Sequence, residues 1–276
     1  MRAALRHPSL AIGLALTLLV VLAAALSFAW TPHSPYEIDL ALRLRAPDAA
    51  HWLGTDAYGR DVLSLLMVGA RASIAVGVIA VGIGLVAGAA LGLLAAARRG
   101  WTQEVVMRVA DFGFAFPAIL TAILFTAAFG PGMGVAITAI GLYNIPTFAR
   151  LARAGAAAVW TRDYVLAAQA CGKGRWAITF EHVLPNIAPV LVVQATLRFA
   201  IAILAEAALS YLGLGTQPPQ ASWGRMLAEA QTLMFQAPLL AVFPGVAIMA
   251  AVLGLNLLGD GLRDLMDPRL ARSRRT

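Results

Sequence analysis

Six long apolar runs constrain the fold of this chain more than any other feature. They cover roughly residues 10–30, 72–97, 112–129, 133–151, 187–214 and 239–258. A helix crosses the hydrocarbon core of a membrane in about 20 apolar residues. With 60% hydrophobic and only 13% charged residues, the chain has too little polar surface for a water-soluble domain. The sequence therefore predicts an all-α, polytopic membrane protein with six transmembrane helices.

The runs divide the chain into three parts. We expect 1–30 to form a cytoplasmic N-terminus and the first transmembrane helix, 31–71 an extracytoplasmic segment, and 72–276 a core with five further helices. The first run follows Arg2 and Arg6 as in a secretory signal, but it is too long for one and five runs follow it. We therefore expect it to be a retained anchor.

Lysine and arginine residues are distributed unevenly between the two sides of the membrane. With the N-terminus in the cytoplasm, 15 fall on that side and 5 on the other, and Arg198 in the fifth run completes the 21. Cytoplasmic loops carry such an excess. We therefore expect both termini and the segment 161–186 to be cytoplasmic. The net charge of +7 then reflects basic loops and C-terminal arginines that attract anionic lipid, and we expect no nucleic-acid partner.

Glycines at four-residue spacing mark the second run. Gly84, Gly88 and Gly92 form a stripe on one helix face, close to Gly77. Small residues at this spacing let a neighbouring helix backbone approach closely. We expect the stripe to serve packing rather than chemistry.

The residues that catalysis or ATP binding would need are missing. All four histidines lie outside the apolar runs, which argues against an intramembrane protease. The chain has no GxxxxGK(S/T) phosphate-binding loop, and its single Cys171 has no partner thiol. We expect no catalytic residue, no metal site and no cofactor in this chain.

Two ionisable residues, Arg198 and Glu206, lie within the fifth run. They are eight residues apart, or about two helical turns, so they share a face. Such residues mark either a translocation path or a structural role, in which the two pair across helices or Arg198 extends to the membrane interface. A proton-coupled carrier would normally hold more buried carboxylates.

The segment YVLAAQACGKGRWAITFEHVLPN, from Tyr164, separates the fourth and fifth runs. Thr161 and Asp163 are suitable N-caps for a first short helix, and Gly172 is placed to end it. A second short helix fits 174–182 and is expected to end at Pro185. One face of this helix carries Trp176, Phe180, Val183 and Leu184. The pattern predicts a structured docking element for a cytoplasmic partner.

The order A-A-x-x-x-G, then eleven residues, then L-P resembles the EAA loop of ABC importer permeases. The matching residues are Ala167, Ala168, Gly172, Leu184 and Pro185. In that family the loop inserts into a groove of the ATP-hydrolysing subunit and passes its closure to the membrane helices. The acidic residue that opens the family motif is Leu166 here. The resemblance thus implies a coupling contact at 161–186 that depends on shape and apolar fit.

Further motifs narrow the resemblance to the second permease subunit of the dipeptide, oligopeptide and nickel importers. HWLGTDAYGRDVLSLLMVGAR at 51–71, EAALSYLGLGTQPPQASWGRML and NLLGDGLRDLMDPRL are similar to that subunit, in the same order. The first motif is met by His51, Leu53, Gly54, Thr55, Asp56, Gly59, Arg60, Asp61 and Ser64, and Leu65 replaces a basic residue that often follows the serine. The likeness extends from about residue 51 to 270.

Charged residues of the first motif lie beside a predicted membrane surface. Asp56, Arg60 and Asp61 either pair with one another or remain solvated. Trp223 follows Pro218 and Pro219 in a loop where the indole would prefer the membrane interface. We treat Asp56, Arg60, Asp61 and Trp223 as candidates for an extracytoplasmic gate or a contact with a binding protein.

The resemblance implies a type I ABC importer permease in the plasma membrane of a bacterium or archaeon. Its expected partners are a second homologous permease subunit, two cytoplasmic ATPase subunits that bind ATP and Mg²⁺, and an extracytoplasmic solute-binding protein. Peptides are the first expected solute and a nickel chelate is the second. An ion-coupled secondary carrier and a non-transporting assembly protein are the rival functions. Co-purification of an ATPase separates both from an importer.

Overall fold

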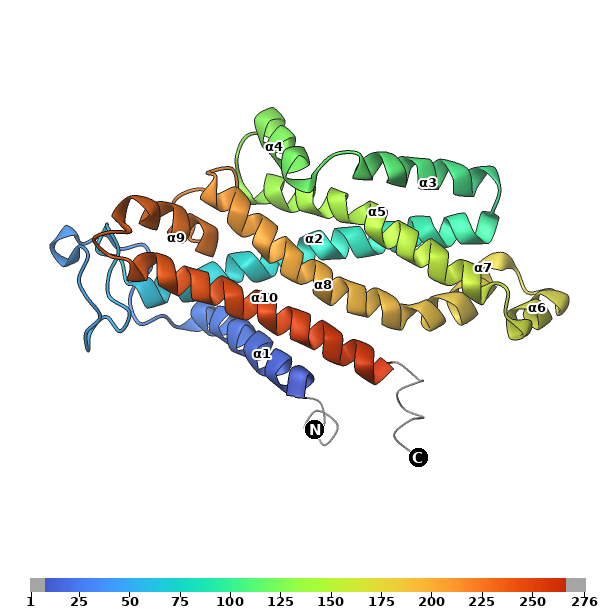
Figure 1. Cartoon of the computed structure of the whole chain (residues 1–276), viewed down its shortest axis with the longest axis horizontal. Helices are drawn as coiled ribbons and strands as arrows, with labels where there is room; N and C mark the ends of the chain where they lie inside the picture. Colours follow the sequence, from blue (N-terminus) through green and yellow to red (C-terminus); the bar gives the residue numbers. More distant parts are fainter. Residues whose placement is uncertain (1–7, 267–276) are drawn as a thin grey trace.

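A bundle of long helices makes up the computed structural model, which describes residues 8–266 (Figure 1). The long helices are α1 (Pro8–Ala29), α2 (Val62–Arg98), α5 (Met133–Val159), α8 (Leu184–Tyr211) and α10 (Leu239–Met266). Shorter elements are α3 (Trp101–Phe114), α4 (Ala118–Phe129), α6 (Asp163–Ala170), α7 (Arg175–Ile178), η3 (Thr179–Val183) and α9 (Trp223–Ala230), with single turns η2 (Leu40–Leu42) and η4 (Gln231–Leu233). No strand occurs within 8–266, which confirms the all-α class. The basic residues expected at the extreme termini, Arg2, Arg6, Arg269, Arg272, Arg274 and Arg275, lie outside these residues.

Within 8–266, five helices are long and apolar enough to cross a membrane, and a sixth span results if α3 and α4 are counted together. The expectation of one continuous helix over 112–129 is wrong, because α3 and α4 meet at 85°. Pro117 lies at this break and lacks the N–H that a helix interior needs, and it disfavours helical geometry at Phe116. The third apolar run is therefore divided between two helices and does not form one straight span.

Helix α2 begins ten residues before the expected start of the second span. Asp61 is its N-cap, and the Asp61 side chain accepts a hydrogen bond from the backbone N–H of Ser64. Residues 62–71 are thus helical and continuous with the second span. Hydropathy alone missed these ten residues, because a helix can continue beyond the apolar stretch that identifies it.

The glycine stripe of α2 is covered by α5, as the sequence predicted. A Cβ atom on Gly84 would collide with Asn144, one on Gly88 with Ile145 and Phe148, and one on Gly92 with Ala149 and Ala152. Gly77 instead faces the ring of Phe199 on α8. Close backbone approach therefore holds α2 between α5 and α8.

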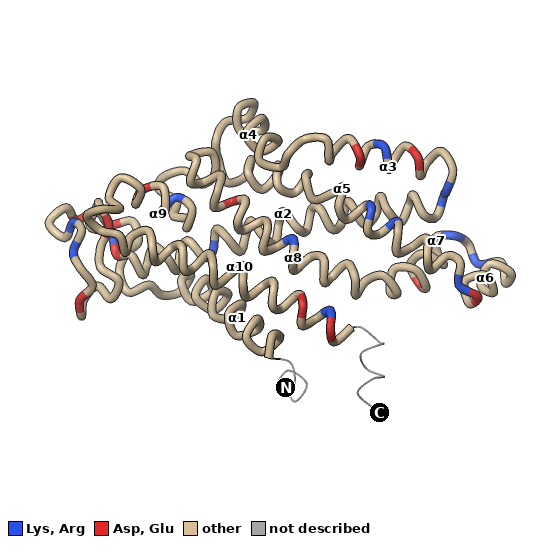
Figure 2. Tube along the Cα trace, viewed as in Figure 1, with Lys and Arg blue, Asp and Glu red and all other residues tan. Residues whose placement is uncertain are grey.

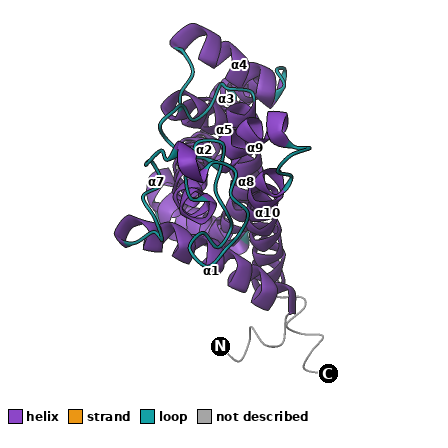
Figure 3. Cartoon of the chain, turned by 90° about the vertical axis from the view of Figure 1, so that its left-hand side faces the viewer, coloured by secondary structure: helices purple, strands orange, loops and turns teal. Residues whose placement is uncertain are grey.

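Helices α1 and α10 form a second close pair. Gly13 abuts the backbone of Leu257 and Leu258, and Gly261 abuts Leu10. The start of α1 therefore lies beside the end of α10. Charged residues gather at the two ends of the bundle and along α3, with few in the middle (Figure 2). Viewed toward the end that carries residues 30–61, loops cross the bundle (Figure 3).

Candidate coupling and gating sites

Elements α6, α7 and η3 form one end of the molecule, on the right of Figure 1. Helix α6 ends in a Schellman motif, in which Lys173 N–H donates to Ala168 O (3.1 Å) and Gly172 N–H donates to Gln169 O (2.9 Å). Gly172 has φ +80°, a conformation that suits glycine. The expected helix end is confirmed. The expected N-caps are wrong, because Arg162 is the N-cap without a side-chain bond, and Thr161 Oγ1 donates to Ala158 O instead.

The second short helix does not end at Pro185. Arg175 to Tyr211 run as one continuous helical stretch through α7, η3 and α8. Within it, η3 is a π-turn, and Leu184 N–H donates to the carbonyl of Thr179, five residues back. A π-turn widens the helix and changes the usual i to i−4 pairing, so Pro185 can lie in the first turn of α8 without breaking it. Residues 175–186 and the fifth span are therefore one continuous helix.

The π-turn also divides the apolar face that the sequence predicted. Val183 is fully buried in the core, whereas Trp176 and Phe180 are exposed, with ring centroids 6.4 Å apart. Leu184 joins these two rings in an apolar groove of about 650 Å³ along α2. The four residues thus lie on two faces, because the extra residue of the π-turn rotates Val183 away.

The five residues that match the EAA loop all lie at this end of the molecule. Ala167, Gly172 and Pro185 are exposed, and Ala168 and Leu184 are half-buried against the core. Lys173 and Glu181 form an ion pair across the elbow. Val165 and Ile178 are fully buried and anchor α6 and α7 to the core. The segment is therefore a fixed projection with an exposed outer surface.

Arg198 and Glu206 both lie on α8, but no ion pair joins them among the described residues. Glu206 is 0% exposed, and its Oε1 accepts hydrogen bonds from Ser210 Oγ (2.6 Å) and Thr216 Oγ1 (3.1 Å). Arg198 is half-buried, and its Nε has no hydrogen-bond partner in the described part of the chain. The structure thus places Glu206 Oε1 in a local polar network, whereas its Oε2 is buried without a hydrogen-bond partner among the described residues. A path-lining role for Arg198 stays a prediction.

Asp56 and Arg60 form the expected pair at the opposite end of the bundle. Arg60 Nε donates to Asp56 Oδ2 at 2.6 Å, and both side chains are largely buried. Arg60 also donates to Glu229 Oε2 on α9, at 2.8 Å. Although burial disfavours its charged form, these two carboxylates raise the pKa of Arg60 above its ordinary value. Sequence reasoning missed Glu229 because 169 residues separate it from Arg60.

Asp61 and Trp223 take different positions from those expected. Asp61 caps α2, contacts His51 and is buried, so it is neither paired with Arg60 nor solvated. Trp223 begins α9 with its side chain buried, and its Nε1–H donates to Leu66 O at 3.0 Å. The indole thus packs against α2 inside the protein, and a contact of Trp223 with a binding protein stays a prediction.

Comparison with known proteins gives concordant matches. Residues 88–272 match the family described as "Binding-protein-dependent transport system inner membrane component". The chain is 41% identical to the glutathione transport system permease protein GsiD of Pectobacterium atrosepticum, over 96% of this chain and 88% of the relative. It is 41% identical to the dipeptide transport system permease protein DppC of Alkalihalophilus pseudofirmus, over 94% and 85%. It is 43% identical to a putative peptide transport system permease protein of Brucella abortus, over 98% and 90%.

A solved structure of the MetNI methionine ABC transporter, in an inward-facing conformation, shares the fold at low sequence identity. The matched chain is 18% identical to this one. The match covers 74% of this chain and 97% of that chain, with a TM-score of 0.61.

Proposed function

Because the chain belongs to the family of binding-protein-dependent transport system inner membrane components and is a permease subunit of an ABC importer, we propose that it forms half of a membrane path for short peptides. It is a multi-pass membrane protein, and ATP hydrolysis is carried by separate subunits. Family membership leaves no place for the two rivals, the ion-coupled carrier and the non-transporting assembly protein.

The continuity of the helical stretch from Arg175 to Tyr211 carries the proposal for coupling. A push on α7, which begins three residues after Gly172, would move α8 as well, because α7, η3 and α8 form one continuous helix. Helix α8 holds Arg198 and Glu206 and packs against α2 through Phe199 and Gly77. Residues 161–186 would therefore convert closure of the ATPase subunits into a rigid-body movement of the helices that line the path.

The proposed assembly has this chain beside a second homologous permease subunit, with two cytoplasmic ATPase subunits and an extracytoplasmic solute-binding protein. ATP and Mg²⁺ would bind to the ATPase subunits. The contact between Gly261 and Leu10 supports placing both termini on one side of the membrane. The excess of basic residues supports the cytoplasm as that side.

Peptides are the solute class that the comparisons favour. The names of the relatives above refer to glutathione, dipeptides and peptides. None of those three refers to nickel, so a nickel chelate has only the sequence resemblance in its favour. Asp56, Arg60 and Glu229 lie at the extracytoplasmic end in this orientation, where a loaded binding protein would dock.

Co-purification followed by reconstitution tests this function. The tagged full-length chain, extracted in mild detergent from its native membrane, is expected to retain a second permease and an ATPase. In proteoliposomes, the ATPase rate should rise when the binding protein is loaded with short peptides, and not when it is offered a nickel chelate. Recovery of the chain alone would contradict the importer assembly, and stimulation by the chelate alone would overturn the solute class.

A further inference from the structure

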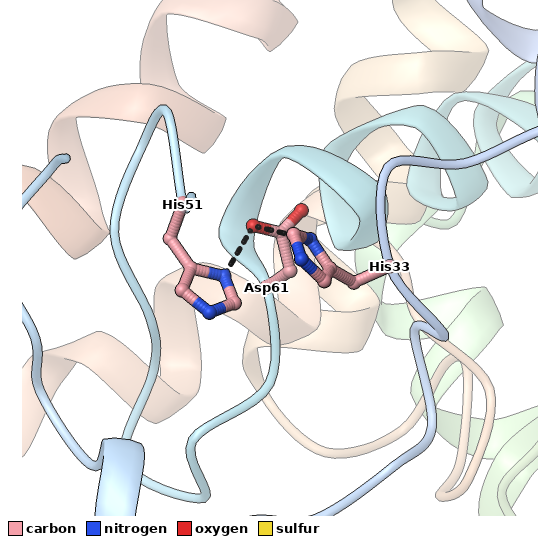
Figure 4. A group of neighbouring side chains, drawn as sticks. All are labelled: His33, His51 and Asp61. Atoms are coloured by element: carbon pink, nitrogen blue, oxygen red, sulfur yellow. Dashed lines mark hydrogen bonds and ion pairs between the residues drawn. The ribbon is translucent and has the colours of Figure 1, made fainter. Parts of the chain in front are cut away.

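Two imidazoles and a carboxylate meet just before the first turn of α2 (Figure 4). The Nδ1 atoms of His51 and His33 lie 3.0 Å and 3.7 Å from the same oxygen, Oδ1 of Asp61. One candidate ligand atom from each residue lies within 4.8 Å of the others. The three residues come from separate stretches of the chain, so the fold, not local sequence, assembles them.

Hydrogen bonds orient the carboxylate of Asp61. Its Oδ2 accepts from the backbone N–H of Ser64 (2.8 Å) and from Ser64 Oγ (2.7 Å). Capping of α2 thus occupies one oxygen and leaves the other, Oδ1, directed at the two imidazoles. Such outer contacts hold a ligand in place before a metal arrives.

The two histidines are held by contacts of their own. The backbone N–H of His33 donates to Ser64 Oγ (3.1 Å), and the backbone N–H of His51 donates to Asp48 Oδ1 (2.6 Å). The imidazole rings lie close together, with centroids 4.3 Å apart and planes tilted by 31°. His51 and Asp61 are buried, whereas the side chain of His33 is 41% exposed. The cluster therefore has a firm inner wall and one side open to solvent.

We propose that His33, His51 and Asp61 bind a transition-metal dication, with Zn²⁺ as the reference occupant. Zinc bonds to imidazole nitrogen and carboxylate oxygen are about 2.0–2.2 Å long, which places neighbouring ligands of a tetrahedral ion roughly 3.4 Å apart. The two distances to Asp61, 3.0 Å and 3.7 Å, bracket that separation, and the ligand atoms of the two histidines lie within 4.8 Å of each other. Two imidazoles favour Zn²⁺, Ni²⁺ or Cu²⁺ over Mg²⁺ or Ca²⁺, which prefer oxygen ligands.

Each histidine would coordinate through Nδ1, with its proton on Nε2. Three protein ligands leave a fourth position, and the exposure of His33 opens that position to water or to a group from a docked partner. The ion would tie the segment after α1 to the start of α2. This assignment does not rest on the proposed transport function. It differs from our sequence expectation of no metal site, because 18 residues separate His33 from His51 and no ligand spacing is apparent.

A zinc titration of the full-length chain in detergent, against a chromophoric chelator, tests the site. A Cys171→Ser background removes the exposed thiol as a competing ligand. We expect one zinc ion per chain, and an affinity at least about tenfold weaker in His33→Ala and His33→Gln. His182→Gln is the matched control, since His182 lies at the opposite end of the molecule. It should bind as tightly as the background chain.

His33 is the decisive position because its exposed side chain can be replaced without removing the Asp61 cap. His33→Cys supplies another zinc ligand and should restore binding. Co²⁺ should give the visible absorption of a four-coordinate ion in the background chain and lose it in His33→Gln. Absence of zinc binding, or binding that is equal in His33→Gln and His182→Gln, would overturn the proposal.

Discussion

Arg60 donates hydrogen bonds to Asp56 at 2.6 Å and to Glu229 at 2.8 Å, so one guanidinium joins the loop before α2 to helix α9. Glu229 is also paired with Arg225, one helical turn away, at 2.9 Å. The planar guanidinium can contact two carboxylates at once, which a lysine ammonium does less well. The loop and α9 therefore form one unit at the proposed extracytoplasmic end.

Arg60→Ala is expected to destabilise the protein by about 2 kcal/mol, because it leaves the largely buried Asp56 carboxylate without its cation and removes one of the two arginines paired with Glu229. The stability of Arg60→Lys should lie between that of Arg60→Ala and that of the unmodified chain. Thermal unfolding of the purified protein in detergent measures the change. Arg43→Ala, at an exposed position in the same loop region, is the control and should change the melting temperature little. Equal melting temperatures for Arg60→Ala and Arg43→Ala would contradict the pairing.

The contribution of the Arg60 charge should not vary between about pH 6 and pH 9. The folded protein raises the pKa of Arg60, so the stabilisation is complete below the pKa of the unfolded chain and is lost only as the pH rises through the folded value. Both values lie far above this range. The difference in melting temperature between Arg60→Ala and the unmodified chain should therefore be constant across it.

Gly172→Pro is expected to abolish transport while the chain still inserts in the membrane. Proline holds φ near −65°, whereas Gly172 has φ +80°, and proline also removes the N–H that donates to Gln169. Gly172→Ala should be milder, at about 1 kcal/mol of local strain. Uptake and ATPase co-purification are the measurements.

The matched control for Gly172 is Gly174→Ala. Gly174 also has open space around it, but its φ of −68° suits any residue. Normal uptake by stably inserted Gly172→Pro would argue against coupling through this elbow. Loss of uptake in Gly174→Ala would show that the surface, and not the turn geometry, is what matters.

Leu166→Glu tests the missing acid of the coupling motif. Leu166 is 50% exposed and lines a cavity of about 340 Å³ with Arg99, Lys173 and Arg175. If the lost acid weakens docking, Leu166→Glu should tighten ATPase binding several-fold, by roughly 1 kcal/mol. Leu166→Gln is the control, because glutamine has nearly the same shape as glutamate but no charge. ATPase retention that is equal in the two variants would indicate a contact that uses shape alone.

Local signals in the sequence predicted some of these features well. The end of α6 was predictable because Gly172, which can adopt a left-handed conformation, follows a helix-forming stretch. The packing stripe of Gly84, Gly88 and Gly92 was predictable from their helical spacing alone. Asp56 and Arg60 are four residues apart, close enough for their pairing to be anticipated. Pro117 carried a local signal as well, but the apolar run around it hid the break between α3 and α4.

Other features depend on contacts that no local pattern encodes. Glu229 reaches Arg60, and His33 reaches Asp61, only after α9 and the segment beyond α1 have packed against α2. The helix continues through Pro185 by means of a π-turn, although proline usually ends a helix. The π-turn is stabilised by the burial of Ile178 and Val183 in the core. The sequence alone could not predict that both side chains would be buried.

Glu206 is expected to act as a structural anchor. Ser210 Oγ bonds to Glu206 and also accepts from Thr216 N–H (2.9 Å), so the carboxylate holds the end of α8 to the loop that follows. Glu206→Gln keeps a carbonyl oxygen in place of Oε1 and should cost about 1 kcal/mol, whereas Glu206→Leu removes the one oxygen that accepts both hydrogen bonds and should cost about 2 kcal/mol or more. Uptake should survive in Glu206→Gln and fall in Glu206→Leu in step with stability. Loss of uptake in Glu206→Gln at an unchanged melting temperature would instead place the carboxylate charge in the translocation path.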